Sequence, residues 1–285
     1  MKKRNFQHIL ERQWARKNFV CIGLDSEFDK IPDCIKKGGK KHKDVFHVLV
    51  DFNRAIIDAT KHLVCAYKPN SAFYERYGSE GVAALRMTIK HIHDVAPDVP
   101  VILDAKRGDI GNTNDGYVSF AFDVLQADAI TVSPYLGYDS LKPFLEKADK
   151  GIIILCRTSN PGSGEFQIGA KNGDQALYQF VAERVAKHWN ANGNCSLVVG
   201  ATYPNELKTV RQIVGDMPIL IPGIGAQGGN LEKTVLAGKN SLNQGMIINS
   251  SRGIIFASPK EDFADAALLE TEKLRNLINQ LLQKE

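Results

Sequence analysis

The sequence predicts an α/β protein of the (β/α)8 TIM barrel class, with a short helix ahead of the first strand. Eight short, continuous runs of apolar and β-branched residues recur along the 285 residues. Such runs are typical of parallel strands that are buried on both faces. Most of the runs are separated by segments long enough for a crossover helix, and eight strand–helix units fit a barrel of this length. A doubly wound open sheet is the alternative that eight strands also permit.

The eight expected strands follow one another from the N-terminal to the C-terminal part of the chain. They are FVCIGL (19–24), LVCAY (63–67), VPVILDA (99–105), AITVS (129–133), GIIILC (151–156), SLVVGA (196–201), PILIP (218–222) and GMIIN (245–249).

Helices are expected where apolar residues repeat every three or four positions. This spacing predicts a short amphipathic helix around Phe6 to Trp14, crossover helices over 45–60 and 175–189, and a closing helix from Asp262 to Leu282. No Pro- or Ser-rich linker divides the chain, so we interpret residues 1–285 as a single domain.

Composition narrows the class of function only slightly. A hydrophobic content of 44% excludes disorder as the main state, and no apolar run approaches about 18 residues, so no membrane partner is expected. The net charge of +4 is too small to argue for a nucleic-acid partner. The basic stretch KKGGKKHK (36–43) is interpreted as a solvated loop, with a phosphate or RNA contact as the alternative.

The cysteines indicate a reducing compartment. There are five, an odd number, and none forms a Cys-x-x-Cys pair. In a chain of this length they are expected to be buried, reduced thiols. The basic N-terminal segment lacks the apolar stretch of a secretory signal, so we expect a cytoplasmic location.

Charged residues gather where strands are expected to end. A barrel places its active site at the C-terminal ends of its strands, and Lys68, Asp104, Lys106 and Asp109 all follow such ends. Asp104 and Lys106 are two apart on an expected strand, so both should point into the barrel mouth. A lysine held between carboxylates stays an ammonium, which is a proton donor and not a Schiff-base nucleophile. A purely structural ion-pair network remains the alternative.

The loops after the last two strands carry the features of a phosphate site. Gly223 and Gly225 follow the seventh strand, and their lack of a side chain would let backbone N–H groups approach an anion. Arg252 follows the eighth strand and offers a permanently charged, planar donor. Loops in these two positions commonly bind phosphate in this barrel. The Gly-rich segment 226–230 is interpreted as a mobile lid. Two tight turns with a surface arginine are the alternative.

The sequence contains no metal-binding motif, nucleophile elbow or P-loop.

The sequence resembles the orotidine 5′-phosphate decarboxylase family, in its longer bacterial-type branch. The resemblance extends from Asp25 to Arg252 and is most specific at DAKRGDIGNT (104–113). PGIGAQGG (222–229) and the later Arg252 match the phosphate site of the family in the same order. The resemblance implies a cofactor-independent decarboxylation of orotidine 5′-phosphate to UMP and CO2 in pyrimidine biosynthesis. It also implies a homodimer in which each active site is shared between two subunits.

The resemblance also implies a role for each matching residue. Lys106 would stabilise the carbanion at C6 of the pyrimidine and protonate it, with Asp104 against the substrate carboxylate and Lys68 bridging the acidic groups and the ribose. Asp109 and Thr113 would reach the site of the partner subunit. The remaining substrate contacts would be Asp25 to the ribose, Ser159 to the pyrimidine amide, and Gln227 and Arg252 to the phosphate.

Two other functions compete with this interpretation. One is a metal-dependent sugar-phosphate decarboxylase or synthase of the same superfamily, which shares the D-x-K-x-x-D spacing. Enzymes of this kind are similar to one another in having a carboxylate at the end of the second strand. This chain has Lys68 at that position, and its positive charge would repel a metal ion. The other is a non-catalytic nucleotide-binding barrel, which would be expected to have lost the Lys/Asp array.

Overall fold

The fold is a barrel of eight parallel strands, seen in a computed structural model that describes residues 4–38, 41–42, 44–225 and 228–283. All eight expected strands form, in the order β4-β1-β12-β11-β10-β7-β6-β5. Their bounds are β1 Val20–Gly23, β4 Val64–Lys68, β5 Ile102–Arg107, β6 Ala129–Val132, β7 Gly151–Arg157, β10 Cys195–Val199, β11 Ile219–Pro222 and β12 Met246–Ser250.

The two strands at the ends of this order, β4 and β5, close the barrel. Parallel bridges join Tyr67 to Val101 and Asn70 to Asp104. The Tyr67 N–H also donates to the Pro100 carbonyl at 3.1 Å. The closed barrel therefore forms rather than the open doubly wound sheet. Every residue of β1, β4, β6, β10 and β12 is buried, which explains why these strands are continuously apolar rather than alternating.

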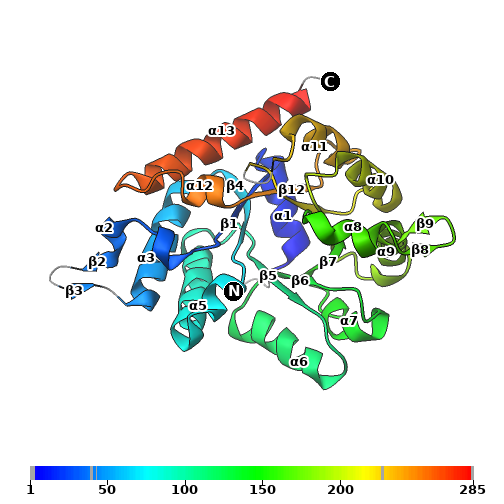
Figure 1. Ribbon diagram of the computed structural model, residues 1–285, viewed down its shortest axis with the longest axis horizontal. Coiled ribbons are helices and arrows are strands. Elements are labelled where there is room, and N and C mark those ends of the chain that lie inside the picture. Colours follow the sequence, from blue (N-terminus) through cyan, green and yellow to red (C-terminus); the bar gives the residue numbers. More distant parts are fainter. Residues whose placement is uncertain (1–3, 39–40, 43, 226–227, 284–285) are drawn as a thin grey trace.

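All of the longer helices except α1 surround the barrel (Figure 1). The longer helices are α1 Phe6–Ala15, α3 Val45–Thr60, α5 Gly78–Val95, α6 Asn112–Ser119, α7 Tyr138–Leu145, α9 Leu177–Arg184, α10 Pro204–Val214, α11 Leu231–Gly238 and α13 Phe263–Gln283. The helix α3 has the predicted bounds. The helix expected over 175–189 begins two residues late, because Gln175 and Ala176 pair as a strand, and it ends in a π-helical turn over Val185–Trp189.

Short elements decorate the loops. They are the helices α2 Asp33–Lys36, α4 Ala72–Glu75, α8 Gly164–Gln167 and α12 Arg252–Ile255, the 3-10 turns Phe28–Lys30 and Pro161–Ser163, the π-helical turn Phe120–Val124, and the strands β2 Lys37–Gly38, β3 Lys41–His42, β8 Lys171–Asn172 and β9 Gln175–Ala176.

The basic stretch predicted as a loop contains a small hairpin instead. Strands β2 and β3 pair antiparallel at the edge of the molecule (Figure 1). A ladder of two residues per strand needs no apolar alternation, so sequence periodicity could not predict it.

The N-terminal helix α1 lies across the centre of the ring of strands in Figure 1 and covers the N-terminal end of the barrel. The Trp14 indole N–H donates to the Met246 carbonyl, at the start of β12, at 2.9 Å. The Phe6 N–H donates to the Asp149 carbonyl, just before β7, at 3.0 Å. With this end covered, the opposite end of the barrel is left for a ligand.

A buried ion pair holds the segment before α1 to the barrel. The Arg4 guanidinium contacts the Asp128 carboxylate at 2.7 Å, and Asp128 also accepts the Val101 N–H at 2.9 Å. Burial opposes the ionisation of Asp128, but Arg4 and His93 outweigh it and lower the pKa of this carboxyl to about 2. The charged form of Asp128 is therefore the form that the folded state stabilises.

Replacing Asp128 with Asn should destabilise the fold. We expect the free energy of unfolding at pH 7 to fall by about 3–5 kcal/mol, because the Arg4 charge loses its buried partner. A carboxyl whose pKa is lower in the folded than in the unfolded chain stabilises the fold at pH values above its unfolded pKa. This stabilisation is lost on acidification. The difference between wild type and variant should therefore shrink as the pH falls from about 4 to about 2 in urea titrations. The exposed Asp174→Asn substitution serves as a control and should change stability by less than about 0.5 kcal/mol.

Candidate active site

A cavity of about 560 Å³ opens at the C-terminal ends of the strands. Side chains from β4, β5, β6, β10 and β12 and from the following loops line it. Seven of the residues predicted from the sequence are among them: Asp25, Lys68, Asp104, Lys106, Ser159, Gly223 and Arg252. The barrel thus brings together residues that are far apart in the chain.

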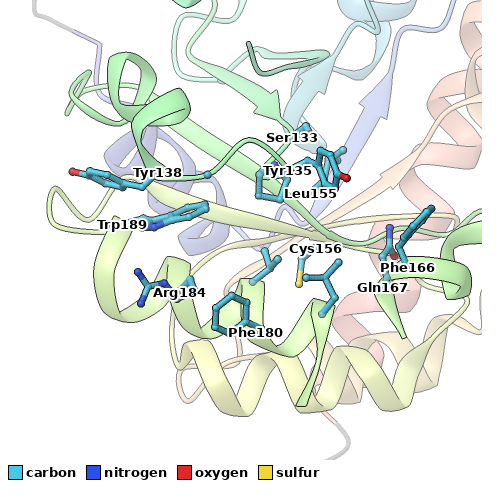
Figure 2. A pocket seen from close by; sticks show the side chains of 14 residues that line it. Ser133, Tyr135, Tyr138, Leu155, Cys156, Phe166, Gln167, Phe180, Arg184 and Trp189 are labelled. Atoms are coloured by element: carbon cyan, nitrogen blue, oxygen red, sulfur yellow. The ribbon is translucent and has the colours of Figure 1, made fainter. Parts of the chain in front are cut away.

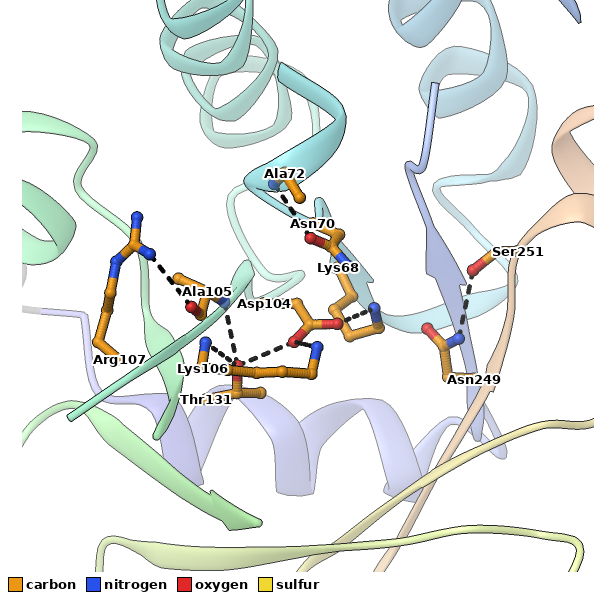
Figure 3. A network of polar contacts seen from close by, with 10 residues as sticks. All are labelled: Lys68, Asn70, Ala72, Asp104, Ala105, Lys106, Arg107, Thr131, Asn249 and Ser251. Carbon is orange, nitrogen blue, oxygen red and sulfur yellow. Dashed lines mark hydrogen bonds and ion pairs between the residues drawn. The ribbon is translucent and has the colours of Figure 1, made fainter. Parts of the chain in front are cut away.

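Asp104 lies between two lysine ammonium groups in this cavity (Figure 3). Lys68 Nζ donates to Asp104 Oδ2 at 2.8 Å, and Lys106 Nζ donates to Asp104 Oδ1 at 2.7 Å. Asp104 and Lys68 are buried, whereas about half of the Lys106 side chain is exposed. Lys106 is therefore the cation of the array that is open to a ligand.

The charges of the buried pair stabilise each other. Burial alone would lower the pKa of Lys68, but the Asp104 and Asp25 carboxylates hold it above its ordinary value. Burial alone would raise the pKa of Asp104, but Lys68 and Lys106 hold it well below its ordinary value. Both groups are accordingly charged across the physiological pH range, and the cavity presents a fixed electrostatic field.

The backbone at Lys106 departs from the prediction. The sequence reasoning placed Asp104 and Lys106 two apart on an extended strand, but Lys106 has a φ of +49°, in the left-handed region. The pairing of β5 with β6 shifts register between Leu103 and Arg107. Lys106 still reaches Asp104, because the bulge turns its side chain back toward the carboxylate. The predicted contact forms, but the extended geometry given as its reason is wrong.

The predicted phosphate end is built from tight turns. Gly223 and Gly225 have φ values of +107° and +88°, which favour glycine. Gly223 and Arg252 line the cavity, whereas Gly225 is not among its lining residues. Gln227 lies outside the described residues, as does part of the lid predicted over 226–230.

Two acceptor oxygens in the cavity have no hydrogen-bond partner among the described residues. They are Oδ1 of Asp25, after β1, and Oδ1 of Asn249, on β12. Buried acceptors without partners are costly, and both of these oxygens belong to residues that line the cavity. Asn249 was not predicted from the sequence. Its one signal was a polar residue at the end of an apolar run.

Asp109 and Thr113 are not in the cavity of their own subunit. The carbonyl of Asp109 accepts hydrogen bonds from Asn114 and Ser140, which ties the segment to α7. Thr113 is exposed, at the start of α6. Of the four charged residues predicted to gather at the strand ends, Asp109 is therefore the one that does not line the cavity of its own subunit.

The loop that carries Ser159 is held by residues that sequence reasoning did not assign. Arg157 is buried at the end of β7, lies over the Tyr203 ring at 3.6 Å and donates to the Thr158 carbonyl at 3.1 Å. Gln167 accepts the Thr158 N–H at 2.9 Å. Arg157 was visible in the sequence as a charge directly after an apolar run. Thr131, which binds Asp104, was also missed.

A second, larger cavity of about 640 Å³ lies beside the first and shares Leu155 and Gln167 with it. Its walls are mainly apolar, with Tyr138 and Trp189 together at one end and Phe166 at the other (Figure 2). No acid–base pair lines it among the described residues, so the charged cavity is the candidate active site.

Residues 19–267 match the model of the family described as orotidine 5′-phosphate decarboxylase / HUMPS. The chain belongs to this family. It is 49% identical over 276 residues to an orotidine 5′-phosphate decarboxylase of Ralstonia nicotianae, covering 96% of this chain and 98% of that protein.

Solved structures of the orotidine 5′-phosphate decarboxylase family share the fold. The Leishmania donovani OMP decarboxylase is 39% identical, with a TM-score of 0.80, over 95% of this chain and 99% of its own. The Leishmania donovani UMP synthase is 40% identical, with a TM-score of 0.86, over 99% of this chain and 57% of its own. The predicted barrel and the predicted family are both confirmed.

No described helix is both long enough and apolar enough to cross a membrane. Within the same residues, no three His, Cys, Asp or Glu side chains gather in a way that could hold a metal ion.

Proposed function

We propose that this enzyme converts orotidine 5′-phosphate to UMP and CO2, with Lys106 as the proton donor. The observation that carries the proposal is the Asp104 carboxylate held between Lys68 and Lys106 in a cavity of a family member. Loss of CO2 from C6 of the pyrimidine leaves an electron pair that the ring π-system does not delocalise. Stabilisation must therefore be electrostatic, and a fixed ammonium group supplies it.

In the proposed reaction, one bond at C6 is broken and one is formed. The bond from C6 to the carboxyl carbon breaks, and its electron pair stays on C6. A proton from Lys106 Nζ forms the new C6–H bond, and the neutral lysine then regains a proton from solvent. Asp104 would face the departing carboxylate and hold Lys106 in place. Lys68 would keep Asp104 charged and contact the ribose.

The rest of the cavity would bind the nucleotide. Arg252, Gly223, Gly225 and Gln227 would hold the phosphate, far from C6, so that its binding energy can be used to close the site. Asp25, with its unpartnered oxygen, would accept a ribose hydroxyl. Ser159 would contact the pyrimidine amide.

A homodimer is part of the proposal, with Asp109 and Thr113 reaching the active site of the partner. Their absence from the cavity of their own subunit supports this arrangement. The nearby surface is also apolar: Ile110, Tyr135, Leu136 and Tyr138 are all exposed. Exposed apolar groups next to one another often mark an interface, and a second copy covering them would bring the Asp109 segment to its neighbour.

We propose that residues 1–285 form one catalytic domain. We propose that the enzyme needs no cofactor, since Lys106 can itself supply charge and proton. A cytoplasmic location is supported by the five cysteines, all of them free thiols.

The function is tested by the loss of orotate absorbance when the purified protein meets orotidine 5′-phosphate. We expect turnover without added metal and in the presence of EDTA, since Lys68 would repel a divalent cation. A protein that released no CO2 from this substrate would contradict the proposal. Inactivation by EDTA would favour the metal-dependent decarboxylases instead.

Replacing Arg252 with Ala should reduce the contribution of the substrate phosphate group to binding and catalysis. We expect kcat/KM for orotidine 5′-phosphate to fall by about 10- to 100-fold, because a charge-assisted contact to the phosphate is lost. Orotidine without the phosphate is the matched control, and its slow turnover should not change. Equal losses with both substrates would show that Arg252 acts on something other than the phosphate.

A further inference from the structure

The pairing of β5 with β6 is irregular where β5 carries the charged residues. Leu103 pairs with Ile130, and the next pair joins Arg107 to Val132. Three residues, 104–106, therefore lie opposite a single residue, Thr131. In a regular ladder, each N–H on this side would find a carbonyl of the neighbouring strand. The bulge breaks this regular pattern, and the N–H groups of Ala105 and Lys106 both face the Thr131 side chain.

The hydroxyl of Thr131 binds the backbone N–H groups at this bulge. Its oxygen accepts the N–H of Ala105 and the N–H of Lys106, both at 3.0 Å. Because those two groups can only donate, the hydroxyl is free to donate to Asp104 Oδ1, at 2.9 Å. A hydroxyl has one donor and two acceptor positions, so this one is fully used (Figure 3).

This hydroxyl holds a turn that the chain does not favour by itself. Lys106 is a non-glycine residue with a φ of +49°, a conformation that is unfavourable for a residue with a side chain. Such a conformation persists only where the surroundings fix it. Thr131 is buried on β6, and it binds the backbone of Lys106 and the carboxylate to which Lys106 Nζ also donates. The Thr131 side chain therefore holds the Lys106 backbone directly and the Lys106 ammonium group through Asp104.

We propose that Thr131 is a positioning residue for decarboxylation, whose hydroxyl holds the Lys106 bulge and orients the Asp104 carboxylate. The inference rests on the proposed function, because it assigns Thr131 to the same reaction. Small displacements of a reacting group can cost large factors in rate. Loss of the hydroxyl should therefore slow the chemical step and leave the phosphate and ribose contacts intact.

The test compares Thr131→Val with Thr131→Ser. Valine keeps the shape but removes the hydroxyl, and we expect kcat to fall by about 10- to 100-fold. The affinity for UMP, measured by calorimetry, should stay within about twofold, because UMP is held by the rest of the cavity. Serine keeps the hydroxyl and should hold kcat within about threefold of wild type.

Control variants separate this role from a general loss of stability. Thr271→Val removes another buried hydroxyl, which donates to Ala267 on α13 at 2.7 Å, and it should leave kcat unchanged. If Thr131→Val does not fold, Thr131→Ala takes its place, since Ala and Ser differ by the hydroxyl alone.

Two results would overturn the inference: wild-type kcat in the variant without the hydroxyl, or an equal loss in Thr131→Ser. Both require an active wild-type enzyme. A wild-type protein without turnover would instead contradict the proposed function.

Discussion

The Lys106→Ala variant is expected to lose decarboxylation while it still binds UMP. Lys106 is the one member of the array that combines a direct bond to Asp104 with an exposed side chain. Alanine removes both the charge that would stabilise the C6 carbanion and the proton that would quench it. Lys68 cannot replace it, because Lys68 is buried and bound to the other oxygen of Asp104.

The expected loss in kcat is at least about 10⁴-fold, since electrostatic stabilisation and proton donation each contribute factors of about 10² or more. Single-turnover measurements of CO2 release would give the rate, and calorimetry with UMP would show that the cavity still binds nucleotide. The surface variant Lys142→Ala is a matched control, because that lysine lies on α7, outside the cavity, and pairs with Glu146. Near-normal turnover by Lys106→Ala would remove Lys106 from the role of proton donor.

The barrel was predictable because its signal is distributed over the whole chain. Each strand is an apolar run that stands out from its neighbours, as in GIIILC (151–156), and burial on both faces makes each run continuous. The hairpin of β2 and β3 could not be predicted in the same way. Two paired residues per strand are too few to show a periodic pattern of hydrophobicity.

The site was predictable in its residues but not in its geometry. Lys68, Asp104 and Lys106 lie at the C-terminal ends of strands, and these ends converge in a barrel. The bulge that turns Lys106 depends on which residue of β6 lies opposite β5 at this point. That register is set by the tertiary structure and cannot be read from the local sequence. Thr131 was missed for the same reason: a threonine in AITVS looks like an ordinary β-branched strand residue until its hydroxyl partners are known.

Mixing two inactive variants should restore activity if the site is shared between subunits. Asp109→Ala is expected to be nearly inactive, because it removes a carboxylate from the array of the partner subunit. In a heterodimer with Lys106→Ala, one of the two sites receives both substitutions. The other site receives neither, because its Lys106 comes from the Asp109→Ala chain and its Asp109 comes from the Lys106→Ala chain.

The size of the recovery follows from the symmetry of a two-fold dimer. Equal amounts of the two chains, exchanged to equilibrium, give about half heterodimers, so about a quarter of all sites are intact. We expect the mixture to reach about a quarter of the wild-type rate per site, from a background near zero. Mixing Lys106→Ala with Asp104→Ala is the matched control, since both residues line the same cavity of one subunit and every heterodimer site then carries a defect. Recovery in this control, or none in the first mixture with exchange verified by mass spectrometry, would contradict the shared site. A difference between the two mixtures would place Asp109 across the interface, because the two pairs of substitutions differ only in which subunit supplies the second carboxylate.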